Sequence, residues 1–401
     1  MSVYKKKLCS VIIIALAGYF LVWGFASGFR WPSNYILTNH VITYIYGFIP
    51  RGLVGEIGSL IFGYKWYSWK YMSAVIMAVG AVFVIWMIYE LVYNGYNFRN
   101  PVMVTLIMLF ALSPYARYYL HEMGYFEQYG YAMLSVAAVF FLKKRRLDVY
   151  VIPCIIGFIS LLVSESNAFL ILPITFMLTL LSIINDSDSE SVKDYIRPCA
   201  ILVCSYIPHI IYTVVVWFIK VPNDLVIKLQ DHDRDMVYYG FGGYNFVFRE
   251  DVHPFLSGDR SNQSIWPRQL RPVPVWSVVM CLLVIVFVTY IIYTHKKDRK
   301  LAVSYAAGTI LTGLGTYSIL IVGWDLDRFY FCIFMSVFWV TVFIVKKYLT
   351  DLKMNVVDGF FICMFLLAGA GLGTNRLQLF DEAVYNEGWL EFLNMVRSKL
   401  G

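Results

Sequence analysis

Long apolar segments recur along this chain, and they constrain its fold more than any other feature. Each is roughly 18–25 residues long, which is enough to cross a hydrocarbon layer about 30 Å thick. They explain why 59% of the residues are hydrophobic and only 15% are charged, against about 25% charged in a soluble domain. A backbone in lipid must satisfy its own hydrogen bonds, which favours helices. We therefore predict an all-α, polytopic membrane protein.

We predict eleven spans, three of them slightly shorter than this, and residues 1–401 form a single transmembrane domain. The first follows the basic start MSVYKKK and is too long for the apolar core of a typical signal peptide, so we expect an uncleaved span. The predicted spans are 8–28, 71–94, 102–120, 129–142, 149–164, 167–185, 198–219, 274–294, 301–322, 329–345 and 356–373.

The segment 44–63 is apolar enough to be mistaken for a further span. It contains Pro50, Arg51, Glu56 and five glycines. Charges and helix-breaking residues of this kind are tolerated where the backbone does not face hydrocarbon on all sides. We therefore expect 29–70 to be a re-entrant or interfacial segment.

Clusters of Lys and Arg predict the orientation. With a cytoplasmic N-terminus, six short cytoplasmic segments carry 17 of the 33 basic residues, including KKRR at 143–146 and KKDRK at 296–300. Cytoplasmic loops are enriched in Lys and Arg. Counting 44–63 as a span would move both clusters outside. We therefore predict eleven spans with a cytoplasmic N-terminus and a C-terminus on the outer face of the membrane.

This orientation gathers the long polar segments on the outer face of the membrane. They are the 29–70 segment, a large loop at 220–273 and an amphipathic tail at 374–401. A binding or catalytic site is therefore expected on that face. The net charge of +7 comes from short loops rather than from a soluble basic face, so nucleic acid is not an expected partner.

Glu165 and Arg51 are the first candidate site residues. Glu165 lies in LLVSESNAFLIL, between two apolar runs, and a carboxylate so close to hydrocarbon is costly and often functional. Arg51, in FIPRGLVGE, has the planar guanidinium suited to bidentate contact with phosphate or carboxylate. The alternatives are a tight-turn glutamate in interfacial water and an arginine that extends to the interface.

The turn GWDLDRFYF supplies three more candidates, Asp325, Asp327 and Arg328. On a helix, Asp325 and Arg328 are three residues apart and could form an ion pair. The alternative role of that pair is a helix-end salt bridge between two spans. Asp327 would lie on another face and could point into a cavity with a raised pKa.

The turn LHEMGYFEQYG contains His121, Glu122 and Glu127. Adjacent residues of a helix diverge, so His121 and Glu122 cannot readily share a metal ion, and a metal site is only weakly indicated. The cysteines fall inside predicted spans, where neither a disulfide framework nor a zinc motif is expected. His209, within a span, could act as a relay, and the commoner role of such a histidine is a hydrogen bond between helices.

The loop 220–273 mixes carboxylates and arginines with aromatic rings, including Tyr244 and Arg249. Such a mixture suits carbohydrate contact, and it equally suits an interfacial lid. The pattern D-x-D at Asp231 and Asp233 could hold a divalent cation on a diphosphate.

These features fit three classes of function. An outer-face glycosyltransferase needs cationic groups for a leaving diphosphate, supplied by Arg51 and Arg328, and a carboxylate base. Glu165, Asp325, Asp327 and Glu127 are the candidate bases. A transporter or flippase would show charges at mid-depth and inverted repeats, which the sequence lacks. A structural or assembly subunit would need no clustered acids.

Three motifs, YGFIPRGLVGEIG, VSESNAFLILP and GWDLDRFYF, together resemble bacterial inner-membrane proteins of surface-polysaccharide gene clusters. Arg51, Glu165, Asp325 and Arg328 match positions of that pattern. The overall plan is similar to O-antigen polymerases of the Wzy type, and serotype-converting glucosyltransferases share it. Residues 29–55 lack the early acidic residue typical of the latter, and Glu56 is the first, which favours the polymerase.

The resemblance implies polymerisation of repeat units carried on undecaprenyl diphosphate. It implies an undecaprenyl-linked oligosaccharide and membrane lipid as ligands, a chain-length regulator as a further partner, and no cofactor beyond a divalent cation. With this family the membrane would be the bacterial inner membrane and the outer face would be the periplasmic face. Together with the glycosyltransferase hypothesis, this predicts Glu165, Asp325, Asp327 and Glu127 as catalytic, of which Glu165 and Asp325 match the family pattern. Arg51, Arg328, Glu56, His121, Arg249 and Tyr244 would bind the diphosphate or the glycan.

Overall fold

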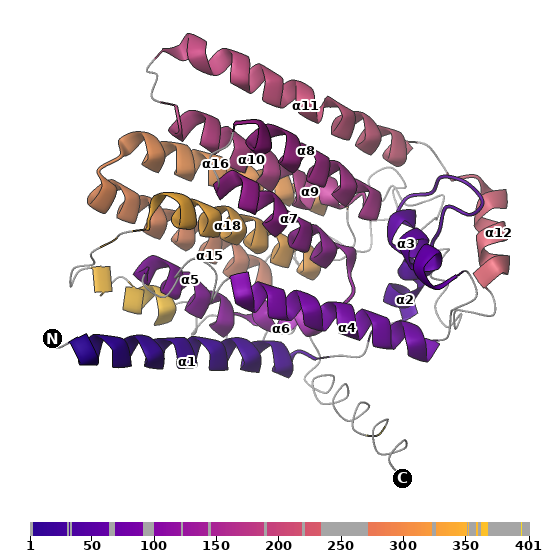
Figure 1. Ribbon diagram of the computed structural model, residues 1–401, viewed down its shortest axis with the longest axis horizontal. Helices are drawn as coiled ribbons and strands as arrows, with labels where there is room; N and C mark the ends of the chain where they lie inside the picture. The colour runs from indigo at the N-terminus through magenta and orange to yellow at the C-terminus, as the bar shows by residue number, and fades with distance from the viewer. Residues whose placement is uncertain are drawn as a thin grey trace.

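The computed structural model shows a bundle of helices (Figure 1). It describes residues 3–29, 32, 34–63, 69–90, 100–121, 123–142, 146–187, 191–218, 221–233, 272–322, 326–350, 352, 358–359, 362–367 and 394. Within these ranges the regular structure is helical throughout, without a strand. The predicted all-α fold is therefore confirmed for the described part of the chain.

The helices follow the predicted spans closely. They are α1 (Val3–Ser27), α2 (Asn34–Val41), α3 (Gly52–Phe62), α4 (Trp69–Ile88), α5 (Pro101–Leu112), α6 (Pro114–His121), α7 (Phe126–Leu142), α8 (Arg146–Val163), α9 (Asn167–Leu170), α10 (Leu172–Asn185), α11 (Val192–Phe218), α12 (Asn223–Asp233), α15 (Pro272–Ile291), the π-helix η4 (Ile292–Lys296), α16 (Arg299–Tyr317), α17 (Ile319–Val322) and α18 (Leu326–Tyr348).

Four helical stretches of the described residues are long and apolar enough to cross a membrane: Asn167–Asn185, Lys193–Val216, Ser277–Lys296 and Arg328–Tyr348. The count of eleven spans stays a prediction. The segment 44–63 contains only the 11-residue helix α3, about 16 Å long at 1.5 Å per residue. It does not form a span, as expected.

Three predicted spans are interrupted in the structure: 167–185 at Ile171, 301–322 at Ser318 and, most clearly, 102–120. The segment 102–120 is not a continuous helix, because α5 ends at Leu112, Ser113 caps it, and α6 begins at Pro114. Proline has no amide hydrogen to continue the helical ladder. The Ser113 hydroxyl closes the end of α5 by donating to the carbonyl of Phe110 at 2.6 Å, and it accepts from the amide of Tyr115 at 3.2 Å.

The centre of the bundle is α18, of whose spanning stretch 94% is buried, against 17% for α11 at the periphery (Figure 1). Aromatic rings of α18 pack on the broken pair α5 and α6. Phe338 stacks on Phe110 with ring centres 5.2 Å apart, and Phe334 stacks on Tyr115 at 4.6 Å. This aromatic packing fixes the depth of α18, and hence of Arg328 near its start.

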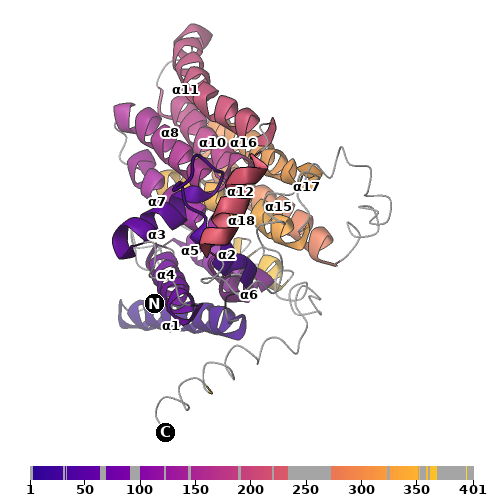
Figure 2. The same cartoon turned by 90° about the vertical axis from the view of Figure 1, so that its right-hand side faces the viewer.

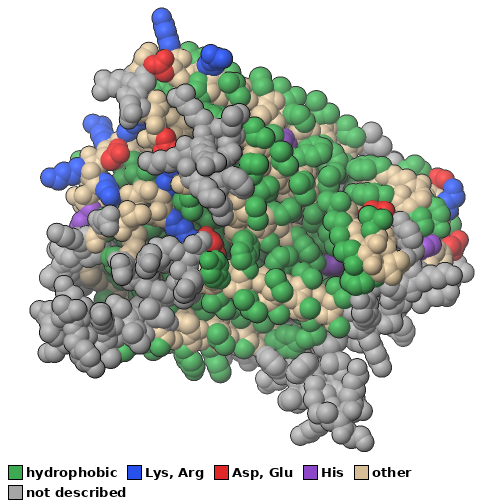
Figure 3. All heavy atoms as spheres, viewed as in Figure 1, with side chains coloured by type: hydrophobic (Ala, Val, Ile, Leu, Met, Phe, Trp, Pro, Cys, Tyr) green, Lys and Arg blue, Asp and Glu red, His purple; other side chains and the backbone are tan. Residues whose placement is uncertain are grey.

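The two ends of the bundle differ. Most of the Lys and Arg side chains visible in Figure 3 gather at one end, beyond a broad apolar middle. There Lys347 bonds to Asp186 at 2.5 Å, Lys346 pairs with Glu90, and Lys300 donates to the hydroxyl of Tyr195 at 2.8 Å. Helices α2, α3 and α12 lie together at the opposite end (Figures 1 and 2).

Candidate functional site

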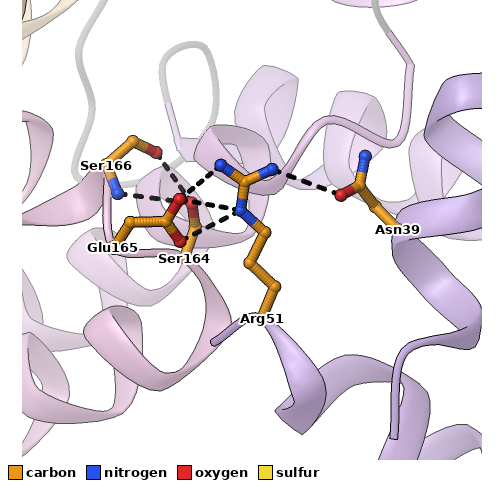
Figure 4. A network of polar contacts seen from close by, with 5 residues as sticks. All are labelled: Asn39, Arg51, Ser164, Glu165 and Ser166. Atoms are coloured by element: carbon orange, nitrogen blue, oxygen red, sulfur yellow. Dashed lines mark hydrogen bonds and ion pairs between the residues drawn. The ribbon is translucent and has the colours of Figure 1, made fainter. Parts of the chain in front are cut away.

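Arg51 is placed by an unusual backbone conformation just before α3. Its φ and ψ are 67° and 5°, in the left-handed region. For a residue other than glycine this costs of order 1–3 kcal/mol and persists only where the surroundings enforce it. The conformation turns the side chain of Arg51 back toward the bundle, away from the axis of α3 (Figure 4).

The guanidinium of Arg51 is bound on two sides (Figure 4). Its Nε donates to Oε1 and Oε2 of Glu165 at 2.9 and 3.0 Å, and one terminal nitrogen pairs with Oε1. The other terminal nitrogen donates to Oδ1 of Asn39 at 3.3 Å. Both charged side chains remain about one-fifth exposed. Residues 114 positions apart in sequence thus meet in a bidentate ion pair, the strong form of this contact.

Glu165 lies in a stiff turn between α8 and α9. The hydroxyls of Ser164 and Ser166 are 2.8 Å apart, and the amide of Asn167 donates to the carbonyl of Ser164 at 3.0 Å. The Asn167 side chain holds the turn against α8 by donating to the carbonyl of Ser160 at 2.8 Å. These bonds fix the direction in which Glu165 points.

The electrostatics around Glu165 favour its ionised form. Burial would raise the pKa of this carboxyl, but the charge and the hydrogen bonds of Arg51 outweigh burial and lower the pKa below its ordinary value of 4.5. The charge of Arg328 acts in the same direction. Glu165 is therefore a carboxylate at neutral pH, able to accept a proton.

A second ion pair lies within electrostatic reach of the first. Nε of Arg328 is 3.3 Å from Oε1 of Glu127, in the first turn of α7. The guanidinium of Arg328 also lies 4.5 Å from the ring centre of Tyr125, a cation–π contact that stabilises the charge. Two arginines and two glutamates from four separate segments thus form one cluster, defined here as Arg51, Glu165, Arg328 and Glu127.

Glu56, a predicted substrate-binding residue, is bonded to the backbone of the segment after α2. Its Oε2 accepts a hydrogen bond from the amide of Tyr44 at 2.9 Å, which ties the middle of α3 to the turn after α2. This contact is a structural one, and the role of Glu56 in substrate binding stays a prediction.

Several predicted site residues are not placed by the structure. Asp325, Tyr244 and Arg249 lie outside the described residues. His121 ends α6 and Asp327 lies in the first turn of α18, but their side chains also fall outside the description. The proposed pair of Asp325 with Arg328 therefore stays a prediction. Within the described residues, no group of three or more His, Cys, Asp or Glu side chains could hold a metal ion.

Sequence reasoning missed Asn39, which bonds to Arg51, and its chain neighbour His40. Nδ1 of His40 is 2.8 Å from the carbonyl of Ile36, and Nε2 is 2.8 Å from the hydroxyl of Tyr129. A carbonyl can only accept, so Nδ1 carries the proton and Tyr129 donates to Nε2. Nothing in the stretch LTNHV signals the contacts of Asn39 with Arg51 and of His40 with Tyr129, because these two partners lie outside α2.

His209 does form the expected bond between helices. Its Nε2 lies 2.8 Å from the carbonyl oxygen of Cys154, joining α11 to α8.

Comparison of the chain with protein-family models, curated proteins and solved structures finds no match. The chemistry of the cluster follows from its side chains. Guanidinium groups bind phosphate oxygens in a bidentate manner, and a carboxylate within hydrogen-bond reach can take a proton from a hydroxyl. Arg51 and Glu165 place both capacities at one partly exposed point.

Proposed function

We propose that this chain is an inner-membrane polymerase of O-antigen or a related surface polysaccharide. It joins undecaprenyl-diphosphate-linked repeat units at the periplasmic face. The observation that best supports the proposal is the meeting of Arg51 with Glu165, beside the second pair of Arg328 with Glu127. Two cationic and two carboxylate groups are the set that transfer of a sugar from a diphosphate needs.

The reaction assigns one role to each kind of group. The bond between the anomeric carbon of the donor and its diphosphate breaks, and a bond from that carbon to the acceptor hydroxyl oxygen forms. Arg51 and Arg328 stabilise the charge that develops on the diphosphate. Glu165 takes the acceptor proton. A carboxylate near the anomeric carbon also stabilises the oxocarbenium-like transition state, a role that Glu127 fills.

The ion pairs would have to rearrange when substrate binds. In the structure Arg51 is occupied by Glu165. A diphosphate that binds the Arg51 guanidinium in place of Glu165 frees the Glu165 carboxylate. Binding of the donor is therefore coupled to exposure of the base. Loss of the Arg51 contact also raises the pKa of Glu165 toward the value that suits a general base.

A divalent cation on the diphosphate and a chain-length regulator belong to the same proposal. Asp231 lies in the last turns of α12 and is exposed, where a cation bound to the donor could be reached. The chain-length regulator would be a separate membrane protein that limits the number of repeats.

The test is complementation of a deletion strain with single variants. Glu165→Gln and Arg51→Lys are expected to reduce the polysaccharide to one repeat unit per core while the protein stays in the membrane. The variants Asp325→Asn and Arg328→Ala are expected to do the same. Asp186→Asn is the matched control, because it removes an ion pair with Lys347 at the opposite end of the bundle and should leave the banding pattern unchanged.

The banding pattern of the deletion strain separates the alternatives. One repeat per core indicates a polymerase. A full ladder with an altered serotype indicates a decorating glucosyltransferase, and loss of all O-antigen indicates a flippase or a ligase. A normal ladder from both Glu165→Gln and Arg51→Lys would contradict the proposed site.

A further inference from the structure

Helix α3 presents two faces of opposite character. Gly52, Gly55 and Ser59, spaced three and four residues apart, are buried against the bundle. The other side exposes Ile57, Leu60, Ile61 and Phe62, with Leu60 73% and Ile61 66% accessible. We call these four residues the apolar face of α3. The only charged residue of the helix, Glu56, is bonded to the amide of Tyr44.

The small residues hold α3 in this rotation. A Cβ atom at Gly55 would lie 2.2 Å from the carbonyl oxygen of Ile42, and one at Gly52 would lie 2.3 Å from the ring of Tyr44. The helix backbone therefore rests directly on the segment after α2. Rotating α3 to hide its apolar face would force larger side chains into this contact. The close packing of Gly52 and Gly55 therefore keeps the apolar face of α3 exposed.

The depth of α3 is set by Arg51. This residue immediately precedes the helix and binds Glu165, which lies two residues before the apolar stretch Asn167–Asn185. The N-terminal end of α3 is therefore level with the N-terminal end of the stretch Asn167–Asn185. This level is the boundary of a bilayer rather than bulk water. A helix of about 16 Å cannot cross the hydrocarbon layer of about 30 Å.

The surface beside α3 is also apolar. Phe48, in the preceding loop, is 57% exposed, and its ring meets that of Tyr212 on α11 at 6.1 Å in an edge-on contact. Around Tyr212, α11 exposes Ile210, Ile211 and Val214. The apolar surface of a long peripheral helix thus continues through the loop, toward the helix that begins at Arg51.

We propose that the apolar face of α3 is embedded in the lipid leaflet at this end of the bundle. A helix that is too short to cross the hydrocarbon layer can bury an apolar face at the boundary of headgroups and acyl chains, and α3 has this length. This seating holds Arg51 at the depth of lipid phosphates. A phosphate-bearing lipid then reaches the cluster from the leaflet. This access of lipid to the cluster rests on the proposed function, whereas the contact of α3 with lipid is independent of it.

The test uses nitroxide spin labels in the full-length chain in liposomes, with the native cysteines replaced. Labels are placed singly at positions 57, 60 and 61, and at 224 and 228 of α12 as controls, where the side chains are strongly exposed and charged. Collisions with molecular oxygen, which concentrates in lipid, are expected to dominate on α3. Collisions with a water-soluble nickel chelate are expected to dominate on α12.

Two results would overturn the inference. Nickel-dominated relaxation at 60 and 61 would place the apolar face in water. An immobilised spectrum with little access for either reagent would show that another protein surface covers it, such as a second copy of the chain.

A second measurement needs no substitution. Wild-type protein is photo-crosslinked to phospholipids that carry a diazirine near the headgroup end of the acyl chain, and the labelled peptides are mapped. Adducts within 53–62 are expected. Adducts on α11 with none on α3 would contradict the proposal, whatever the catalytic tests show.

Discussion

At the residue scale, the polar groups near the cluster are held in one ionisation state by their surroundings. His40 is fully enclosed, and burial lowers its pKa to about 4 despite the hydrogen bond to the carbonyl of Ile36. It is therefore neutral at pH 7, with its protonation fixed by one acceptor and one donor. Its chain neighbour Asn39 bonds to Arg51, so both residues belong to the segment that packs beside the cluster.

The lowered pKa of His40 predicts that the free energy of unfolding depends on pH. An unfolded histidine ionises near pH 6.5, so between pH 6.5 and about 4 the unfolded state binds more protons than the folded state. The free energy of unfolding should therefore fall as the pH is lowered through this window, by up to about 3 kcal/mol. The thermal midpoint in detergent, measured from pH 7.5 to 5, checks this.

Two variants isolate the contribution of His40. His40→Asn keeps a donor for the carbonyl of Ile36 but cannot ionise, so its midpoint should fall less steeply on acidification than that of the wild type. Tyr129→Phe removes the donor to Nε2 but keeps an ionisable imidazole, so its midpoint should still fall more steeply on acidification than that of His40→Asn. Equal slopes for His40→Asn and wild type would refute the assignment.

At the element scale, α12 is joined to the segment that carries Arg51. Leu229 of α12 is fully buried in a small apolar cluster with Val41, Ile42 and Ile49. Gly47, at φ 138°, lets the loop pass close to Leu225, since a Cβ there would lie 3.1 Å from its Cδ1. Helix α12 opens the large loop predicted at 220–273, so a glycan bound to that loop could influence Arg51 through these contacts.

Truncating Leu229 should therefore release α12. Leu229→Ala removes a fully buried side chain, and such changes cost about 2–5 kcal/mol, here concentrated in the local cluster. Amide hydrogen exchange of residues 223–233 should accelerate, while α10 and α18 keep their protection. Ile227→Ala is the matched control, because Ile227 is 55% exposed and its truncation should leave exchange unchanged. Unaltered exchange in Leu229→Ala would show that α12 is held by other contacts.

At the scale of the whole molecule, the bundle has one end bearing Arg51, Glu165 and α12 and another bearing paired lysines. Charged residues at the second end are partly buried in ion pairs, such as Lys347 with Asp186. The excess of basic residues in the short loops predicts that this second end faces the cytoplasm, which puts the cluster on the periplasmic side.

Cysteine labelling tests this orientation directly. In a cysteine-free background, Tyr46→Cys should react with a membrane-impermeant maleimide in intact spheroplasts, because Tyr46 is exposed at the Arg51 end. Lys193→Cys, at the start of α11, should react only after the membrane is permeabilised. The reverse pattern would invert the orientation and move the proposed chemistry to the cytoplasm.

The sequence by itself determined the helical class, the positions of most helices and the exclusion of 44–63 as a span. These properties depend on local length, polarity and proline placement, which are readable one segment at a time. Arg51 and Glu165 were also recognisable singly, because charges beside long apolar runs are costly. The break at Ser113 was missed, although Pro114 was its visible signal.

Only the tertiary structure decided which charges meet. The spacing of three residues predicts Asp325 as a partner of Arg328, and that pair stays a prediction because Asp325 lies outside the described residues. The structure adds a partner that the sequence did not suggest, Glu127, some 200 positions away. Helix neighbours in a bundle are chosen by the packing of side chains over long sequence separations, and aromatic contacts such as Phe338 with Phe110 set the depth of each helix. The same packing buries His40 and brings Asn39 to Arg51, which no local pattern encodes.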